Sequence, residues 1–450
     1  MTFSSPRFPA IRSISCLFAL ICIAAPSHAV TIEWDGTIGN FTEPVNWVGD
    51  IAPVAGDDAR ISNGGTAQLS GSQGLLFLIL AAGTGQSGNF QMSPGAVLTT
   101  TSDIRIGNGG TAGGAGAITQ SGGDVIMSGG NINVGFGDTA IGTYNMSGGT
   151  IGINSATIYA VGNRGTGTVN QSGGSVYVRG PITASATTGT GQLNLGRNGA
   201  VAAGNPGTSS GAYTLSGGDF TAAQLRYGNN AAGAATGSTN AFNLQGTGTL
   251  VVGAISIVNA NALNSFNFTG GTLKATTVGI PINNNGGTLS PSTLFFGSAT
   301  TNAPATAAEV EMSPVGTTTF TLANTYNQGP TGTLAVDLSA PATNDFVSIG
   351  ADPALFVTAN IAGTIRVNSM FEPSLGSVFD ILAADDVINT AAVIGQTPGG
   401  KLFSSSVVPG ADGREVLRLT VVPEPGSAGL LVGAALPFLF RRLRRTQVAA

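Results

Sequence analysis

Hydrophobic residues in this chain come mostly in short runs in which apolar and polar positions alternate. Residues 332–338, 363–367 and 377–382 follow this two-residue period, which is typical of β-strands with one buried face. Residues 75–80 are apolar throughout, but such a short run fits a buried strand and cannot cross a membrane. The pattern therefore predicts many short strands.

Composition supports an all-β protein. Among 450 residues there are 69 glycines and only 9% charged residues. Glycine and asparagine at turns, between β-branched residues, are typical of many strands joined by tight turns. The 42% hydrophobic content argues against the alternative of a disordered low-complexity chain.

One short phrase recurs five times in the middle of the chain: Ser or Thr, two glycines, a polar residue and an apolar one. Its copies begin at Ser121, Ser147, Ser172, Ser216 and Thr269. The first glycines lie at 122, 148, 173, 217 and 270, so the gaps are 26, 25, 44 and 53 residues, and the last two are near double the first two. A second, Gly-Asn-rich phrase between the copies begins at Ile106, Val161, Leu195 and Tyr227. Each unit thus holds several strands and must stack on its neighbours, as in a solenoid.

We expect these repeats, placed at residues 64–300, to form a right-handed parallel β-helix. Each Ser-Gly-Gly would be a corner where a positive φ lets the chain turn into the next strand. Ile, Val and Leu would point inward at alternate positions, and Asn, Thr and Ser would stack in ladders between coils. The alternative is a β-sandwich or barrel, because Asn-Gly and Gly-Gly also make hairpin turns. A repeated period favours the solenoid.

Two regions flank the repeats. Residues 30–63 contain both tryptophans, Trp34 and Trp47, and would cap the exposed end of the solenoid. The alternative for this pair is an aromatic platform on which a glycan stacks. Residues 301–421 keep the two-residue alternation and form a C-terminal β region. The sequence leaves open whether this region finishes the solenoid or makes a small β cap.

Residues 1–29 have the form of a secretory signal peptide with its signal helix, and we expect cleavage between Ala29 and Val30. Two arginines precede an apolar core at 14–25, and small residues precede the cleavage point. The core is too short for a span, which argues against a membrane anchor or a buried helix. The Sec translocon and signal peptidase are therefore expected partners.

Residues 422–445 contain three parts in order. Val422, Pro423, Glu424 and Pro425 precede an apolar run at 428–440, and a basic cluster follows at Arg441, Arg442, Arg444 and Arg445. This order resembles the PEP-CTERM sorting signal. The apolar run is shorter than the ~20 residues of a full span, and arginines resist translocation, so we expect a short sorting helix that holds the chain transiently in the inner membrane. The resemblance implies cleavage near Pro-Glu-Pro by an exosortase-type membrane peptidase. The alternative is an uncleaved tail anchor.

The mature chain has few of the side chains used in catalysis. Cys16, Cys22 and His28 are the only cysteines and histidine, and all lie in the signal peptide. Their loss excludes a Ser-His-Asp triad, a cysteine nucleophile, a zinc site of the usual ligands and a disulfide. Without the six arginines and one glutamate of the signal and tail, 11 basic and 21 acidic residues remain, a net charge of about −10. This disfavours nucleic-acid binding.

Parallel β-helices can carry polysaccharide-cleaving sites, so the carboxylates need separate attention. Glycoside hydrolysis needs two carboxylates that face each other across a sugar. Adjacent pairs occur only at Asp57-Asp58 and Asp385-Asp386, and the other aspartates are scattered. Without a convergent polar set, we expect no catalytic residue, no metal and no cofactor.

The repeats at roughly 64–294 are similar to those of autotransporter-passenger-like surface proteins that carry PEP-CTERM tails. This resemblance implies a protein of a Gram-negative bacterium that is exported, held briefly in the inner membrane and then delivered to the cell surface or extracellular matrix. Its expected role is structural or adhesive, with exopolysaccharide as a partner. The alternative is a carbohydrate-binding or polysaccharide-degrading β-helix protein.

Overall fold

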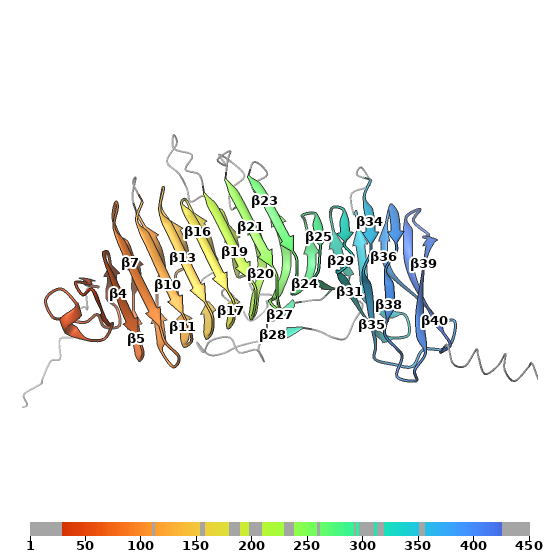
Figure 1. Cartoon of the computed structure of the whole chain (residues 1–450), viewed down its shortest axis with the longest axis horizontal. Helices are drawn as coiled ribbons and strands as arrows, with labels where there is room; N and C mark the ends of the chain where they lie inside the picture. Colours follow the sequence, from red (N-terminus) through yellow and green to blue (C-terminus); the bar gives the residue numbers. More distant parts are fainter. Residues whose placement is uncertain are drawn as a thin grey trace, which may run out of the picture.

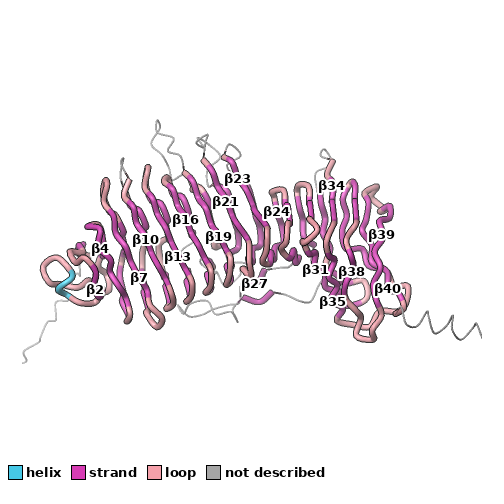
Figure 2. Tube along the Cα trace, in the orientation of Figure 1, coloured by secondary structure: helices cyan, strands magenta, loops and turns pink. Residues whose placement is uncertain are grey.

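The structure is a computed structural model that describes residues 29–109, 113–153, 158–179, 190–197, 209–228, 238–258, 262–291, 294–296, 310–312, 319–350 and 356–424. Figure 1 shows an elongated molecule whose strands lie side by side along the long axis. Figure 2 shows that the described chain is nearly all strand and loop, with one short helix, η1 (Pro44–Asn46), near the N-terminal end. The expected signal and sorting helices lie outside the described residues.

One side of the molecule is a parallel sheet of thirteen described strands. In chain order these are β2 (Ile38–Asn40), β4 (Asn63–Leu69), β7 (Ser87–Met92), β10 (Ala115–Gln120), β13 (Ile141–Met146), β16 (Thr166–Gln171), β19 (Ser210–Leu215), β21 (Thr239–Leu244), β23 (Leu263–Phe268), β25 (Ile282–Asn284), β30 (Tyr326–Gln328), β34 (Thr358–Ile361) and β37 (Asp386–Asn389).

The remaining sides belong to a larger, 25-stranded sheet. Its first part comprises β1 (Thr31–Glu33), β3 (Asp58–Ile61), β5 (Ser72–Leu75), β6 (Phe77–Leu80), β8 (Val97–Thr100), β9 (Ile104–Asn108), β11 (Asp124–Met127), β12 (Ile132–Phe136), β14 (Thr150–Ile153), β15 (Ile158–Asn163), β17 (Ser175–Val178), β18 (Gln192–Leu195) and β20 (Asp219–Tyr227). Its second part comprises β22 (Thr249–Ile257), β24 (Thr272–Val278), β26 (Thr288–Pro291), β29 (Thr319–Leu322), β31 (Thr333–Ala340), β32 (Thr343–Asn344), β33 (Phe346–Ile349), β35 (Thr364–Ser369), β36 (Val378–Ala384), β38 (Ala392–Ile394), β39 (Leu402–Pro409) and β40 (Glu415–Val422). A separate antiparallel pair joins β27 (Leu294–Phe296) to β28 (Val310–Met312).

In the repeats, each turn of the chain gives one strand to the 13-stranded sheet and then one long or two short strands to the 25-stranded sheet. The coil β10–β11–β12 pairs in parallel with the next coil, β13–β14–β15. Ile118 pairs with Tyr144, and Val125 pairs with Ile151. Parallel pairing between successive turns is the stacking of a solenoid, whereas hairpins would give antiparallel neighbours. The predicted parallel β-helix is therefore confirmed.

The Ser-Gly-Gly phrase forms the corner between the first and second strands of a coil, as expected. β10 ends at Gln120 and β11 begins at Asp124, so one copy fills the gap between them. The second glycine of all five copies has a φ between +73° and +83°, a conformation that costs an L-residue energy. The second phrase lies at the end of the strand that leads back to the 13-stranded sheet, as in β9 and β15.

The two long gaps between copies of the phrase have different origins. Across the 44-residue gap, β16 pairs directly with β19, and β17 with β20. This gap is therefore one coil, and treating it as a near-double of the repeat is wrong. Across the 53-residue gap, β21 lies between β19 and β23, so this gap is two coils. The intermediate coil turns at 245–248 without the phrase.

Alternating residues fill the inside of the coils. Phe90, Ile118, Tyr144, Val169 and Tyr213 occupy the same inward position in successive strands of the 13-stranded sheet, and all are at most 1% exposed. Because a shift of one residue would turn every side chain to the other face, this buried column fixes the register between coils.

The C-terminal region both finishes the solenoid and closes it. β29, β30 and β31 pair in parallel with β24, β25 and β26, so the solenoid continues beyond residue 300. Further parallel pairs join β34 to β37 and β35 to β38. Finally, β40 pairs antiparallel with both β36 and β39. This antiparallel end covers strand edges that would otherwise be free to pair with another chain.

The N-terminal region likewise belongs to the solenoid and caps it. β1 pairs with β3 and β2 with β4, in parallel, so the expected boundary between residues 63 and 64 falls inside β4. The segment between β2 and β3 folds back over the end. Val48 N donates to Glu33 O at 2.9 Å, and Asp35 N donates to Asn46 O at 3.1 Å. The segment thus satisfies the outer edge of β1.

Candidate functional site

The outward side of strands β2 to β34 in the 13-stranded sheet, called the outer face below, carries no charge. None of these twelve strands contains Asp, Glu, Lys or Arg, and Asp386 in β37 is the first charged residue of the sheet. The 25-stranded sheet carries charged residues in β1, β3, β9, β11, β20, β24, β31, β35, β36 and β40. The strands on one long side of the solenoid therefore lack charged residues, whereas the other sides carry them. Strands β7 to β23 of this uncharged side are labelled in Figure 1.

One outward position in every strand of the outer face holds an amide or a hydroxyl. The strand registers align twelve such residues, called the polar row below: Asn40, Gln68, Gln91, Thr119, Asn145, Asn170, Thr214, Asn243, Asn267, Asn283, Asn327 and Asn360. All are exposed or partly exposed. With neighbouring strands about 4.8 Å apart, the row extends for roughly 53 Å.

Hydrogen bonds between coils hold the polar row in place. Asn170 Nδ2 donates to Asn145 Oδ1 at 2.9 Å, and Asn267 Nδ2 donates to Asn243 Oδ1 at 2.7 Å. Similar bonds join Gln68 to Gln91 at 2.9 Å, Asn243 to Thr214 at 3.1 Å, Asn327 to Asn283 at 3.1 Å and Asn360 to Asn327 at 2.7 Å. The expected ladders of stacked polar residues are thus present.

Short side chains lie next to the polar row along each strand. The adjacent outward positions from β4 to β23 hold Thr66, Asn89, Ala117, Thr143, Thr168, Ala212, Ala241 and Ser265. They lie two residues before the row, about 6.6 Å away along the strand. Because none of these side chains is long, a low strip runs beside the polar row from β4 to β23.

Sequence reasoning identified only part of the polar row. Asn145, Asn170 and Asn267 lie two residues before copies of the recurring phrase and could be aligned from it. Asn283, Asn327 and others lie in coils without the phrase, and only the pairing of strands brings them into line. The available signal was an amide or hydroxyl at the next-to-last position of each short strand of the outer face from β4 to β34.

Several charged side chains outside the outer face form ion pairs. Arg105 bonds Asp103 at 2.9 Å and lies between the rings of Phe77 and Phe136, with its guanidinium carbon 5.1 and 4.6 Å from their centroids. Comparable pairs join Arg164 to Asp138 at 3.1 Å and Arg60 to Glu33 at 3.4 Å. These contacts neutralise charge locally and attach neighbouring coils to each other.

Trp34 and Trp47 do not form a glycan-stacking platform, so that hypothesis is wrong. Trp34 is 2% exposed and Trp47 is 0% exposed. Their rings meet edge-to-face with centroids 5.0 Å apart, and Trp47 Nε1 donates to Phe41 O at 2.7 Å. The folded-back segment encloses both indoles, so neither presents a face to a sugar. Their role is to fill the capped end, the other reading of the sequence.

The adjacent carboxylate pairs are used in turns. Asp57 accepts hydrogen bonds from Val30 N at 3.3 Å and Val54 N at 3.0 Å. Burial raises the pKa of Asp58, which lies close to Arg60. Asp385 accepts a hydrogen bond from Val357 N at 2.8 Å. The bond to Val54 closes a turn, whereas the bonds to Val30 and Val357 join residues far apart in the sequence.

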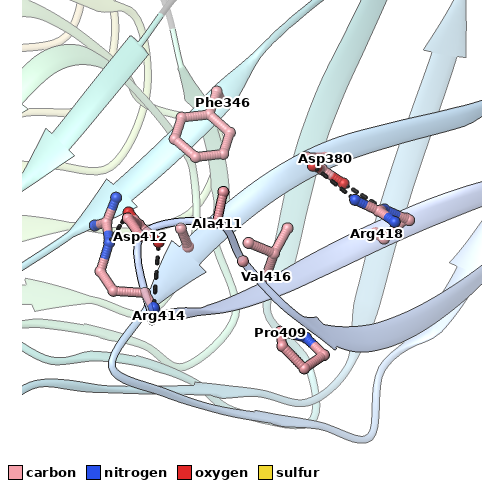
Figure 3. A pocket seen from close by; sticks show the side chains of 10 residues that line it. Phe346, Asp380, Pro409, Ala411, Asp412, Arg414, Val416 and Arg418 are labelled. Atoms are coloured by element: carbon pink, nitrogen blue, oxygen red, sulfur yellow. Dashed lines mark hydrogen bonds and ion pairs between the residues drawn. The ribbon is translucent and has the colours of Figure 1, made fainter.

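A pocket of about 620 Å³ lies at the closing end of the solenoid, between β36, β40 and the loop that precedes β40. Its charged side chains are paired: Arg414 bonds Asp412 at 2.7 Å, and Arg418 bonds Asp380 at 2.6 and 3.0 Å (Figure 3). The Arg414 bond lowers the pKa of Asp412, and Asp380 raises the pKa of Arg418. A charged ligand would have to displace these internal partners.

Asp345, just before β33, is the most perturbed carboxyl in the described part of the chain. It is 5% exposed, and burial raises its pKa to about 7. Its Oδ2 accepts a hydrogen bond from Asp337 N at 3.0 Å, which opposes the shift, while the Asp337 carboxylate reinforces it. This group titrates near neutral pH inside the solenoid.

The expected processing sites flank the folded body. Val30 O accepts a hydrogen bond from Asp58 N at 2.9 Å, and Ala29 is the first described residue. At the other end, Val422 is the last residue of β40, and Pro423 and Glu424 are exposed. Pro425 and the four arginines, Arg441, Arg442, Arg444 and Arg445, lie outside the described residues. The cleavage sites stay predictions.

None of the helical structure in the described ranges has the length and hydrophobicity needed to cross a membrane. Within the same ranges, no three Asp, Glu, His or Cys side chains gather where they could hold a metal ion. The sequence matches no protein-family model, and a search of curated proteins finds no similar sequence.

Proposed function

We propose that this chain is an exported, non-enzymatic structural or adhesive protein of the cell surface or extracellular matrix, associated with exopolysaccharide. In this proposal the Sec translocon and signal peptidase act on its N-terminal segment. An exosortase-type peptidase then cuts near the sorting motif and frees the body from the inner membrane. The resemblance of the tail to the PEP-CTERM signal supports this order of events.

One observation carries the proposal. The last described strand, β40, ends at Val422, and the Pro-Glu-Pro motif begins at the next residue. Pro423 and Glu424 are exposed, so a peptidase could reach the motif without opening the closing sheet. Cutting there would leave β36, β39 and β40 intact. This position of the motif, directly after β40, supports the sorting proposal.

The body has properties that suit a passive role outside the cell. Its tyrosines in the core, such as Tyr144 and Tyr213, are fully buried, and burial raises the pKa of both phenols. A continuous core runs through the coils from the N-terminal cap to the closing sheet, as expected for a stiff solenoid. With no cysteine in the mature chain, its stability does not depend on disulfide formation.

The test is mass spectrometry of the protein recovered from cells with and without their sorting peptidase. We expect a mature N-terminus at Val30 and a C-terminus near Pro423–Pro425, whereas cells without the peptidase keep the tail. The double variant Pro423→Ala/Glu424→Gln should also keep the tail. A matched control changes a Glu-Pro pair within the described body, Glu372→Gln/Pro373→Ala, and should be processed normally. A mature product that retains Arg445 would overturn the sorting proposal.

A carbohydrate-binding role is the second candidate, and the uncharged outer face favours it. Polysaccharide degradation would require facing carboxylates. Release of new reducing ends from a sugar polymer by the purified protein would contradict the non-enzymatic part of the proposal.

A further inference from the structure

We propose that the outer face binds extended chains of a neutral polysaccharide along the polar row. This inference deepens the proposed function and rests on it in one respect, that the protein meets polysaccharide outside the cell. Three features of the outer face supply the rest: an uncharged surface, a line of polar side chains held at a fixed spacing, and a low strip beside it.

The polar row keeps hydrogen-bonding capacity for a ligand. An asparagine side chain offers two N–H donors and an oxygen with two lone pairs. The bond from Asn170 to Asn145 uses one donor of the first residue and one lone pair of the second. Each amide therefore retains a donor or an acceptor for a sugar hydroxyl. Because the ladder already restrains these side chains, binding orders them at a reduced entropic cost.

The distribution of charge on the protein favours a neutral polysaccharide over a charged one. The mature chain has a net charge of about −10, which repels polyanions at long range. The twelve strands of the outer face offer no lysine or arginine to hold an acidic sugar and no carboxylate to hold a basic one. Amides and hydroxyls complement the hydroxyl groups of neutral sugars. Binding should accordingly change little with ionic strength.

The same surface is poorly suited to a second copy of the chain. The buried centre of a stable protein interface is rich in aromatic and other apolar side chains. On the outer face, the exposed large apolar residues are Ile38 (63%), Ile141 (55%) and Leu263 (72%). Four intervals between strands separate Ile141 from Leu263, or about 19 Å. These isolated side chains do not form a continuous apolar patch.

Repetition converts weak contacts into useful affinity. Each amide contributes one or two hydrogen bonds, which are worth little individually in water. A polymer that lies along the row engages many coils at once, so successive contacts become intramolecular. Affinity should therefore rise with chain length until the polymer spans the row, roughly 53 Å at the spacing between strands. A pocket site would saturate after a few sugars.

The experiment measures binding of the mature secreted protein to three probes: a soluble neutral β-glucan, a neutral α-glucan and alginate. The double variant Thr143→Arg/Thr168→Arg places two long cations on the low strip of the outer face. Its matched control, Thr99→Arg/Ser175→Arg, makes the same change in charge at partly exposed positions of the 25-stranded sheet. Urea unfolding midpoints of both variants establish that they fold.

We expect the wild type to bind at least one neutral glucan, with oligomers weaker than polymer and little effect of salt. The outer-face variant should bind about tenfold or more weakly, a loss of at least about 1.4 kcal/mol, and the control should bind like the wild type. Binding to alginate alone, equal binding by the two variants, or no binding to either neutral glucan would overturn the inference. Self-association in sedimentation that T143R/T168R abolishes, without glucan binding, would assign the face to a second copy.

Failure here is distinguishable from failure of the proposed function. A protein with a processed C-terminus that is recovered outside the cell but binds no neutral glucan would refute this inference alone. An unprocessed protein that stays in the inner membrane, yet binds glucan when purified, would refute the sorting proposal alone.

Discussion

The corners of the solenoid stack so closely that one added methyl group should destabilise it. Gly149 and Gly95 both lie in corners between the 13-stranded sheet and the following strand, and both have a φ of +83°. A Cβ at Gly149 would overlap the carbonyl oxygen of Gly123 and lie 2.7 Å from the carbonyl carbon of Gly122. A Cβ at Gly95 would meet nothing within 4 Å. The two glycines therefore share a backbone conformation and differ in the space around them.

The magnitude follows from separating these two effects. Placing an L-residue in the left-handed region costs about 1–2 kcal/mol, and this cost applies to both Gly95→Ala and Gly149→Ala. Overpacking against backbone that cannot move freely adds about 1–3 kcal/mol, and this applies to Gly149→Ala alone. We expect G95A to lower the free energy of unfolding by about 1–2 kcal/mol and G149A by about 2–5 kcal/mol.

Urea unfolding followed by circular dichroism provides the comparison. The slope of the transition reports the surface exposed on unfolding, and solenoids can unfold in parts, so slopes as well as midpoints must be compared. If both variants keep the wild-type slope, the difference between their midpoints isolates the contact between coils. Equal midpoints, or a lower midpoint for G95A, would refute the idea that close stacking of corners requires glycine.

Two further substitutions test the buried polar groups. Tyr144→Phe should cost about 1–3 kcal/mol, because it leaves Gln120 Oε1, which accepts the phenol hydrogen bond at 2.7 Å, without a partner inside the coil. The control is Tyr159→Phe, because the Tyr159 hydroxyl is buried and bonds nothing in the described structure. Urea unfolding should show no loss of stability for this control. Equal losses of stability for the two variants would contradict this account. Asp345→Asn should remove part of the pH dependence of stability. Burial raises the pKa of Asp345 in the folded state to about 7 from an ordinary value of 3.8. The cost of ionising this buried carboxyl is therefore absent below pH ~4 and grows as the pH rises to ~7, reaching on the order of 4 kcal/mol. Thermal melts across this range should show a flatter profile for D345N, and an unchanged profile would contradict the burial argument.

Local rules were sufficient to predict the repeating part of the fold. The Ser-Gly-Gly corners follow from glycine's access to positive φ, and the inward column follows from simple alternation, so both were visible in the sequence. The number of coils across the 44-residue gap could not be predicted from the sequence, because one enlarged coil and two ordinary coils have similar lengths. Only the direct pairing of β16 with β19 distinguishes them.

The ends and the outer face depended on contacts between distant residues. The sequence favoured a cap for Trp47 and left sugar stacking as the alternative. The choice depends on the segment that folds back and lets the Trp47 indole donate to Phe41 O. Likewise, Asn327 is connected to the rest of the polar row by its hydrogen bonds with Asn283 and Asn360 on neighbouring coils. No local pattern shows that these three amides form one line.

The regularity of the outer face has its origin inside the coils. Gln171, the inward neighbour of Asn170, donates to Gly174 O at 3.1 Å in its own corner and to Asp219 O at 3.0 Å in the next coil. These bonds, with the buried column that contains Tyr144 and Tyr213, fix the register of each coil on the next. Because inward and outward residues alternate along one strand, any slip that displaced Gln171 would also take Asn170 out of line. A binding surface of this kind therefore needs no dedicated support, since the core that stabilises the solenoid also sets the spacing of its amides.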